Sequence, residues 1–224
     1  MMPFVRRALL AIGLACVSYS VLAQGFLFTS WMLPAGATFS TWSPTDKAAA
    51  VTLSGGNLIA TDPTSATAGV RGTKSHSSGK WIFEIAKNAD FGANTYIGFA
   101  TAAQVLTAAN TTAAFGCLPN RSGSLWYHNT FPISCQSFSS AKPADFAVDL
   151  TANLAWYSLN CGIWNNSGAA NPATGVGGID ISAVFAGNPA FPYTLFDSSG
   201  GNSTLNVGAS PFNCSIPAGF SAWG

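Results

Sequence analysis

Short segments that alternate apolar and polar residues follow one another along most of the chain. Residues 81–85 (WIFEI) combine aromatic and β-branched residues, with Glu84 on the face opposite Phe83. This pattern is typical of a β-strand. Further strands are predicted at 94–100, 124–128, 146–150, 154–159, 193–196 and 203–207. Because Gly, Asn, Ser and Pro turns separate these short segments, the chain is predicted to be an all-β sandwich or barrel.

Two features refine this pattern. Only residues 151–153 separate the predicted strands 146–150 and 154–159, so these two strands are expected to form a hairpin. An Ala-rich stretch, in contrast, predicts a short helical turn near residues 102–108. The sequence has no internal repeat with a period of about 20 to 50 residues, which argues against a propeller or a solenoid.

The first 23 residues have the pattern of a secretory signal peptide. Arg6 and Arg7 give a cationic start, an apolar run follows, and cleavage is predicted between Ala23 and Gln24. The alternative is a retained membrane anchor, but the run is shorter and more polar than a spanning helix of about 20 apolar residues. The mature chain, 24–224, is therefore expected to be a single domain that is secreted, periplasmic or on the cell surface.

The mature chain carries little charge. Charged residues make up 8% of the sequence, and removal of Arg6 and Arg7 leaves seven Lys and Arg against eight Asp and Glu, a net charge of −1. A nucleic-acid-binding domain needs a basic patch or stripe, which this composition does not supply. No later segment has about 18 consecutive apolar residues, so no membrane span is expected in the mature chain.

Four cysteines remain after cleavage: Cys117, Cys135, Cys161 and Cys214. An even number in an exported protein predicts two disulfides, and four cysteines allow three pairings. We favour Cys117–Cys135, which closes a short local loop, and Cys161–Cys214, which ties a hairpin tip to the C-terminal strand. The sequence has no C-x-x-C pair and no phosphate-binding loop, so neither a metal site nor a cofactor is expected.

Few residues are candidates for hydrolase chemistry. A glycosidase needs two carboxylates about 5 to 9.5 Å apart. Glu84 is the single Glu of the chain. Asp145 and Asp149 share one face of a predicted strand, but about 13 Å would separate them. A carboxylate pair across two strands stays open at this point.

A serine-hydrolase site has no better support. No G-x-S-x-G motif occurs, and only His76 and His128 are available as a base. His76 is expected in a solvated turn, and His128 in a polar turn beside Asn129. We therefore predict that the protein is not an enzyme.

One segment has the composition of a binding surface. Within eleven residues it contains Arg121, Trp126, Tyr127, His128, Asn129 and Phe131. Tyr, Trp and Arg are the residue types that dominate binding energy at protein interfaces. In the alternative interpretation Trp126 packs inward, and only residues 127–129 are exposed.

Several segments in the same order resemble the SPRY domain, the core of B30.2, in its secreted or phage-associated bacterial form. Residues 70–73 (VRGT) and 78–85 (SGKWIFEI) are similar to that family's VRST and SGKWYWEV, and residues 97–100 (IGFA) to its IGIA strand. The other similar segments are 145–150, 154–160, 191–193, 205–208, 211–212 and 216–220. Each segment is weak alone, but their common order, from about Trp42 to Trp223, is fairly specific.

The resemblance implies a bent antiparallel β-sandwich of the SPRY and concanavalin-like kind. It implies that Trp81, Trp156 and Phe212 belong to the framework, buried on the inner faces of the two sheets. The chain departs from the family at Cys161, where the family has Gly or Asn, and at Cys214, within the closing motif. The two departures together are expected of an added disulfide.

In this family, variable loops at one end of the sandwich form a shallow surface for a protein or peptide. The leading hypothesis is therefore a secreted, non-enzymatic binding module that recognises a protein or peptide through its loops. One alternative is a carbohydrate-binding surface domain, because an aromatic-rich, low-charge surface with Asn and Ser suits sugars. The other alternative is a structural subunit of an extracellular appendage or coat, which the low charge also fits.

Overall fold

The structure, a computed structural model, describes residues 38–88, 95–109, 112–118, 124–134 and 142–224. These residues belong to one compact unit, Thr38–Gly224. The predicted signal peptide and its cleavage site lie outside the described residues, so both stay predictions. Within the described part of the chain, no helix is long and apolar enough to cross a membrane.

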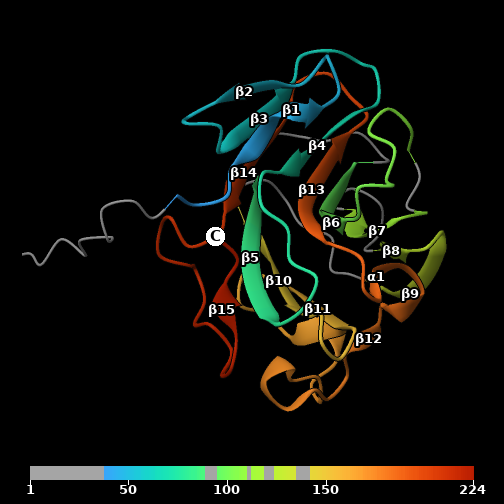
Figure 1. The fold of residues 1–224 in the computed structure, drawn as a ribbon, viewed down its shortest axis with the longest axis vertical. Helices are drawn as coiled ribbons and strands as arrows, with labels where there is room; N and C mark the ends of the chain where they lie inside the picture. The colour runs from blue at the N-terminus through green and yellow to red at the C-terminus, as the bar shows by residue number, and fades with distance from the viewer. Residues whose placement is uncertain (1–37, 89–94, 110–111, 119–123, 135–141) are drawn as a thin grey trace, which may run out of the picture. The chain divides into compact units, whose positions relative to one another are not determined.

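The strands form two sheets that pack against each other (Figure 1). The seven-stranded sheet has the order β1-β4-β13-β6-β7-β8-β9, and neighbouring strands are antiparallel. Its strands are β1 (Trp42–Lys47), β4 (Ala68–Gly72), β6 (Tyr96–Ala100), β7 (Ala114–Leu118), β8 (Ser124–Tyr127), β9 (Thr130–Ser134) and β13 (Phe191–Phe196).

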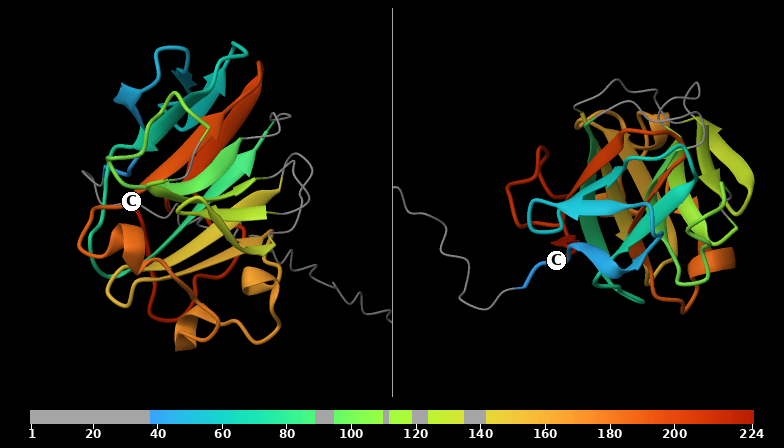
Figure 2. Two further views of the ribbon diagram at one scale, coloured as in Figure 1. Left: turned by 90° about the vertical axis from the view of Figure 1, so that its right-hand side faces the viewer. Right: turned by 90° about the horizontal axis from the view of Figure 1, so that it is seen from above.

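The eight-stranded sheet has the order β12-β11-β10-β5-β14-β3-β2, and β15 pairs with β5 beside this path (Figure 2). Its strands are β2 (Thr52–Ser54), β3 (Ile59–Asp62), β5 (Lys80–Lys87), β10 (Pro143–Asp149), β11 (Leu154–Leu159), β12 (Ile179–Asp180), β14 (Gly201–Asn206) and β15 (Ser221–Ala222). The predicted antiparallel sandwich is confirmed, and the predicted hairpin is β10 with β11.

Aromatic rings from both sheets form the core. On β5, Phe83 points between the sheets, whereas Glu84 points to the opposite face, which we call the outer face. The Phe83 ring stacks on Phe146 of β10 with 5.2 Å between centroids, and it meets Phe99 of the other sheet edge-on at 6.4 Å. Phe99 in turn stacks on Phe115 at 4.9 Å. All four rings are fully buried, so these contacts join the two sheets.

Helical structure is short throughout the described residues. It consists of α1 (Ser182–Phe185) and the 3-10 turns η1 (Trp164–Asn166) and η2 (Pro172–Thr174). The helical turn predicted near residues 102–108 is wrong, because that segment forms turns and bends. The guanidinium of Arg71 donates to the carbonyl oxygens of Gln104, at 2.7 Å, and Thr101, at 3.4 Å. The loop is thus shaped by a side chain of the sheet rather than by helical hydrogen bonds.

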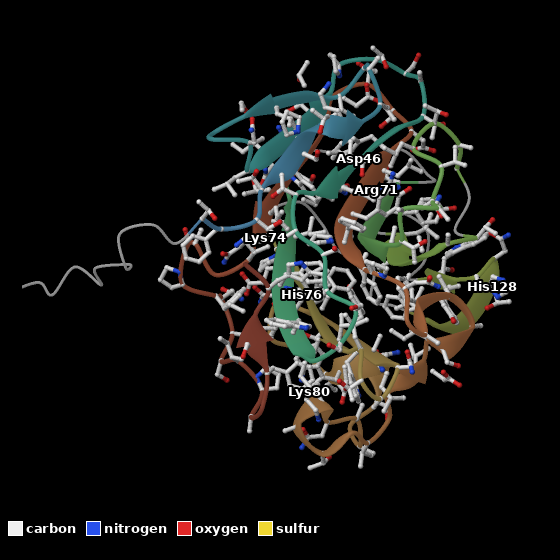
Figure 3. All side chains as sticks on the ribbon, in the orientation of Figure 1. Asp46, Arg71, Lys74, His76, Lys80 and His128 are labelled. Carbon is white, nitrogen blue, oxygen red and sulfur yellow. A yellow bond between two sulfur atoms is a disulfide. The ribbon has the colours of Figure 1, made fainter. Side chains whose placement is uncertain are left out.

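The same Arg71 side chain, in β4, fixes this strand to its neighbour β1. Its Nε and Nη2 donate to the two carboxylate oxygens of Asp46 at 2.7 and 2.8 Å (Figure 3). Such a bidentate pair is stronger and more directional than a single hydrogen bond. Arg71 is only 6% exposed, and a buried charge is costly unless it is paired. The hydrogen bonds to Asp46 and to the two carbonyls supply the partners that the guanidinium needs.

We predict that Phe83→Ala lowers the free energy of unfolding by about 3–5 kcal/mol, because it removes a fully buried ring and leaves a cavity between the sheets. Urea denaturation followed by tryptophan fluorescence measures this loss. Val105→Ala is the control, since the Val105 side chain is 49% exposed and its truncation should change stability by less than about 0.5 kcal/mol. Equal effects of the two substitutions would contradict this description of the core.

Candidate functional site

The hairpin of β8 and β9 contains the residues that the sequence singles out for binding. Arg121 and the side chain of Phe131 lie outside what the structure describes. The other four residues, from Trp126 to Asn129, occupy the end of β8 and the turn that follows it. The structure therefore brings them together, but not on one face.

Tyr127 points into the molecule. Its side chain is 7% exposed, and its hydroxyl accepts a hydrogen bond from the backbone N–H of Val184 in α1 at 3.2 Å. Burial raises the pKa of the Tyr127 hydroxyl. The expectation of an exposed Tyr127 is therefore wrong, because the strand alternates and the neighbouring Trp126 takes the outer face. There the Trp126 ring, half-buried, meets Tyr96 edge-on at 6.0 Å.

His128 and Asn129 form the exposed tip of the hairpin. Both have positive φ angles, 48° and 58°, as a two-residue turn with the right-handed twist of a hairpin requires. The Asn129 amide Nδ2 donates to the Thr112 hydroxyl at 3.1 Å. This bond and the Tyr127–Val184 bond at the base of the turn restrict the position of the tip. The expected exposure of His128 is confirmed.

His76 does not lie in a solvated turn, as the sequence had suggested. Its ring is half-buried and stacks on Trp81, with 3.6 Å between centroids and 12° between planes. Nε2 donates to the backbone carbonyl of Trp223 at 2.8 Å. Burial, and to a lesser degree the charge of Lys74, lowers the pKa of His76 against the raising effect of that hydrogen bond. Figure 3 shows His76 well away from His128, so the two histidines do not share a site.

Two carboxylates face each other on the outer face of the eight-stranded sheet. Glu84 of β5 and Asp145 of β10 are direct partners in the antiparallel register. They are only 4% and 1% exposed. Carboxylate oxygens of both residues lie within 4.8 Å of each other. Two unit charges at that distance repel each other by about 3 kcal/mol at an effective dielectric constant of about 20. Burial and the adjacent Glu84 charge raise the pKa of Asp145 to about 6.

Within the described part of the chain, the hydrogen-bond donors to this carboxylate pair are uncharged. They are Asn213 N and Asn206 Nδ2 to Glu84, at 2.7 and 3.0 Å, and Ser158 Oγ and Cys161 N to Asp145, at 2.7 and 3.2 Å. The two carboxylates lie closer together than the separation of about 5 to 9.5 Å that a glycosidase needs, and both residues are almost completely buried. We therefore describe it as a structural carboxylate pair.

A disulfide adjoins the carboxylate pair. Cys161 and Cys214 are bonded with an S–S distance of 2.04 Å, which confirms the predicted pairing. Cys214 Sγ lies 3.5 Å from an Asp145 oxygen, but a disulfide sulfur is not a thiolate, so this group does not have the ligands of a metal site. Cys117 is also disulfide-bonded, and its predicted partner Cys135 lies outside the described residues.

Two solved structures share this architecture. The SPRY domain of human HERC1 superposes with a TM-score of 0.60 at 14% sequence identity, over 76% of this chain and 99% of that one. The PSpry domain of TRIM65 gives 0.55 at 11% identity, over 75% and 92%. The chain has a SPRY-like fold. Comparison with protein families and with curated proteins gives no match by sequence.

The framework roles implied for the tryptophans are partly correct in this SPRY-like fold. Trp156 is fully buried, as expected, but it lies on the outer face of its sheet and not on the inner one. Its ring meets Phe220 edge-on at 6.3 Å, and its Nε1 donates to the carbonyl of Val176 at 2.9 Å. Trp81 and Phe212 are only half-buried. Through Phe220 the C-terminal segment contributes to a small apolar cluster with Trp156 and Ala147 outside the sandwich core.

We predict that Tyr127→Phe lowers the free energy of unfolding by about 1 kcal/mol, because it removes one of the two acceptors of the Val184 N–H, the other being the Ile181 carbonyl, while the buried ring stays. Chemical denaturation measures the loss. His128→Asn, one residue further along, should leave stability unchanged within about 0.5 kcal/mol, since His128 is exposed and Asn tolerates its positive φ. If only the His128 variant lost stability, the assignment of the two side chains would be wrong.

A second prediction concerns the carboxylate pair of this SPRY-like fold. The pKa of Asp145 is about 6 in the folded chain, against about 3.9 when unfolded, so Asp145 makes stability fall as pH rises from about 4 to 6. Asp145→Asn cannot ionise. Relative to the wild type, this variant should therefore gain on the order of 2 kcal/mol between pH 4.5 and pH 7.5.

Urea unfolding at the two pH values measures this gain. Asp180→Asn is the matched control, because Asp180 is exposed and a hydrogen bond from Ser182 lowers its pKa, so its effect should be the same at both pH values. An Asp145→Asn effect that is also independent of pH would show that the wild-type pair does not retain a proton.

Proposed function

We propose that the protein is a secreted, non-enzymatic binding module that recognises a protein or peptide through the tip of the β8–β9 hairpin. The observation that carries this proposal is the exposed turn His128–Asn129, which is held in place by the Asn129–Thr112 and Tyr127–Val184 hydrogen bonds. A restrained turn loses little conformational entropy when a partner binds. The half-buried Trp126, on the adjacent strand end, adds apolar surface beside this polar tip.

Secretion is supported by two independent features of the chain. The first 23 residues have the composition of a signal peptide, which places the mature N-terminus at Gln24. The Cys161–Cys214 disulfide is of the kind that persists in oxidising compartments. We therefore infer that the protein meets its partner outside the cytoplasm, in the periplasm, at the cell surface or in the medium.

A non-catalytic role is supported by how the ionisable groups are used. His76 donates through Nε2 to a backbone carbonyl and is stacked on Trp81, so it is poorly placed to act as a base. Glu84 and Asp145 are buried beneath the C-terminal segment. His128 is exposed, but it lies apart from both groups, and we infer that it contributes to binding by hydrogen bonding.

A carbohydrate ligand is the second candidate, and one polar row on the outer face favours it. The row runs across three adjacent strands and the residue that follows β5, and consists of Thr52 (β2), Thr61 (β3), Asn202 (β14) and Asn88. Asn202 Nδ2 donates to Thr61 Oγ1 at 2.7 Å, and Asn88 Nδ2 donates to Asn202 Oδ1 at 2.6 Å. Uncharged amides and hydroxyls held in fixed positions are groups that can bind sugar hydroxyls.

The proposal predicts that the mature chain, 24–224, captures a discrete protein from the envelope or culture medium of its host. The test variant is His128→Asn with Asn129→Gly. Asn-Gly is the preferred dipeptide for this turn, so the hairpin is kept while both side chains change. We expect the variant to lose at least tenfold in affinity for the captured protein, measured by surface plasmon resonance.

The matched control is Asn153→Gly in the β10–β11 turn, another positive-φ position, which should bind like the wild type. Unchanged binding by the His128/Asn129 variant would exclude the hairpin tip as the binding surface. Capture of polysaccharide alone would favour the carbohydrate-binding function. Capture of the protein itself alone would favour a structural subunit.

A further inference from the structure

Residues 207–220 leave β14 at Val207, which is still buried in the core, and return to β5 across the outer face of the eight-stranded sheet. They are attached to this face at Glu84. Asn213 N and Asn206 Nδ2 donate to the two Glu84 oxygens at 2.7 and 3.0 Å. Asn206 Oδ1 in turn accepts from Gly208 N at 3.1 Å and so turns the chain away from β14. The carboxylate of one residue of β5 therefore organises both ends of the turn at 206–213.

A second attachment lies next to the first. The Cys161–Cys214 disulfide joins this segment to the end of β11, with 5.4 Å between the Cα atoms. Asn213 Nδ2 donates to Asn160 Oδ1 at 3.3 Å beside it. The covalent bond and the bonds to Glu84 thus hold neighbouring residues, 213 and 214, and the pairing of β15 with β5 holds the C-terminal end of the segment.

Few positively charged side chains lie near the carboxylate pair beneath the segment. From β5 the nearest charged side chain on this face is Lys80, four residues from Glu84, and it is paired with Asp149 of β10 at 3.1 Å. From β11, Ser158 is uncharged, and Tyr157 lies on the inner face. From β14, Asn206 is uncharged. Residues 207–220 contain no ionisable side chain besides the bonded Cys214.

Two buried charges in such surroundings can be stabilised in two ways. The pair can keep one proton, which then bridges the two carboxylates. Burial favours this protonated form, since it raises the pKa of Asp145 to about 6. Otherwise water must reach the oxygens, and the segment 207–220 stands in its way. The hydrogen bonds from Asn206 and Asn213 are stronger when Glu84 is charged. Both bonds go to Glu84, so they do not stabilise a charge on Asp145.

We propose that the Glu84–Asp145 pair is an acid-stabilised clasp for residues 207–220: the segment is closed while the pair shares a proton, it loosens when both carboxylates are charged, and the Cys161–Cys214 disulfide limits how far it opens. Opening moves Phe220, the last residue of the segment, away from Trp156 and Ala147, with which it forms a small apolar cluster on the outer face. This device lies on a different part of the molecule from the β8–β9 hairpin and does not depend on the proposed function.

Hydrogen exchange followed by mass spectrometry tests the clasp in the mature chain, 24–224. We compare the protection of peptides from residues 208–219 at pH 5.0 and pH 7.5, corrected for the intrinsic exchange rate, in the wild type and in Cys161→Ser/Cys214→Ser. The double variant should lose at least tenfold in protection between the two pH values, and the disulfide-bonded wild type less than threefold. Peptides from β13 serve as the internal reference.

Adding Glu84→Gln, or separately Asp145→Asn, to the cysteine variant should reduce its pH effect to less than threefold, because either change prevents the second charge. Asp180→Asn is the matched control and should leave the tenfold effect in place. Equal protection at both pH values in the cysteine variant overturns the proposal, as does a pH effect that survives both carboxylate substitutions. If one carboxylate variant fails to fold, the other and the cysteine variant alone still decide.

Discussion

The middle of strand β5, residues 82–85, is buried on both faces, and most of the architecture depends on this constraint. On the inner face Phe83 stacks on Phe146 and meets Phe99 of the opposite sheet. On the outer face the C-terminal segment covers Glu84 through Asn213. The buried middle of the strand cannot place a polar residue toward water, so every polar group it carries there needs a partner within the protein. The position of Glu84 therefore determines which residues must be near it.

Features that depend on local alternation could be predicted from the sequence. The period of two in residues 81–85 places Phe83 and Glu84 on opposite faces whatever their neighbours are. The short turn 151–153 likewise determines that β10 and β11 pair. The Cys161–Cys214 bond follows from two departures at positions that the resemblance aligns. In each case a few consecutive residues, or one family pattern, contain the information.

Features that depend on register between distant strands could not be predicted. Glu84 and Asp145 are far apart in the sequence, and only the β5–β10 register makes them partners. Alternation along each strand predicts which residues share a face with Glu84 or with Asp145. It does not predict that β5 and β10 are neighbours or which of their residues are paired. The same limit applies to Tyr127, since alternation says that Trp126 and Tyr127 face opposite ways without saying which is inward. Contact with α1 decides that question in favour of Tyr127.

Because the chain carries little charge, a few buried ionic groups account for much of the electrostatic energy inside the fold. Arg71 is satisfied by Asp46 and two carbonyls, so it links β4 to β1 and to the loop at Thr101 and Gln104. Among the residues that the structure describes, the donors to Glu84 and Asp145 are neutral, so the interaction between the two carboxyl groups changes with protonation. Two like charges that no positive group neutralises remain in a fold only where the free energy gained by the surrounding packing exceeds the repulsion between them. Here the aromatic core on the other face of β5 and β10 supplies that packing, and the adjacent disulfide keeps the covering segment in reach when the repulsion is greatest.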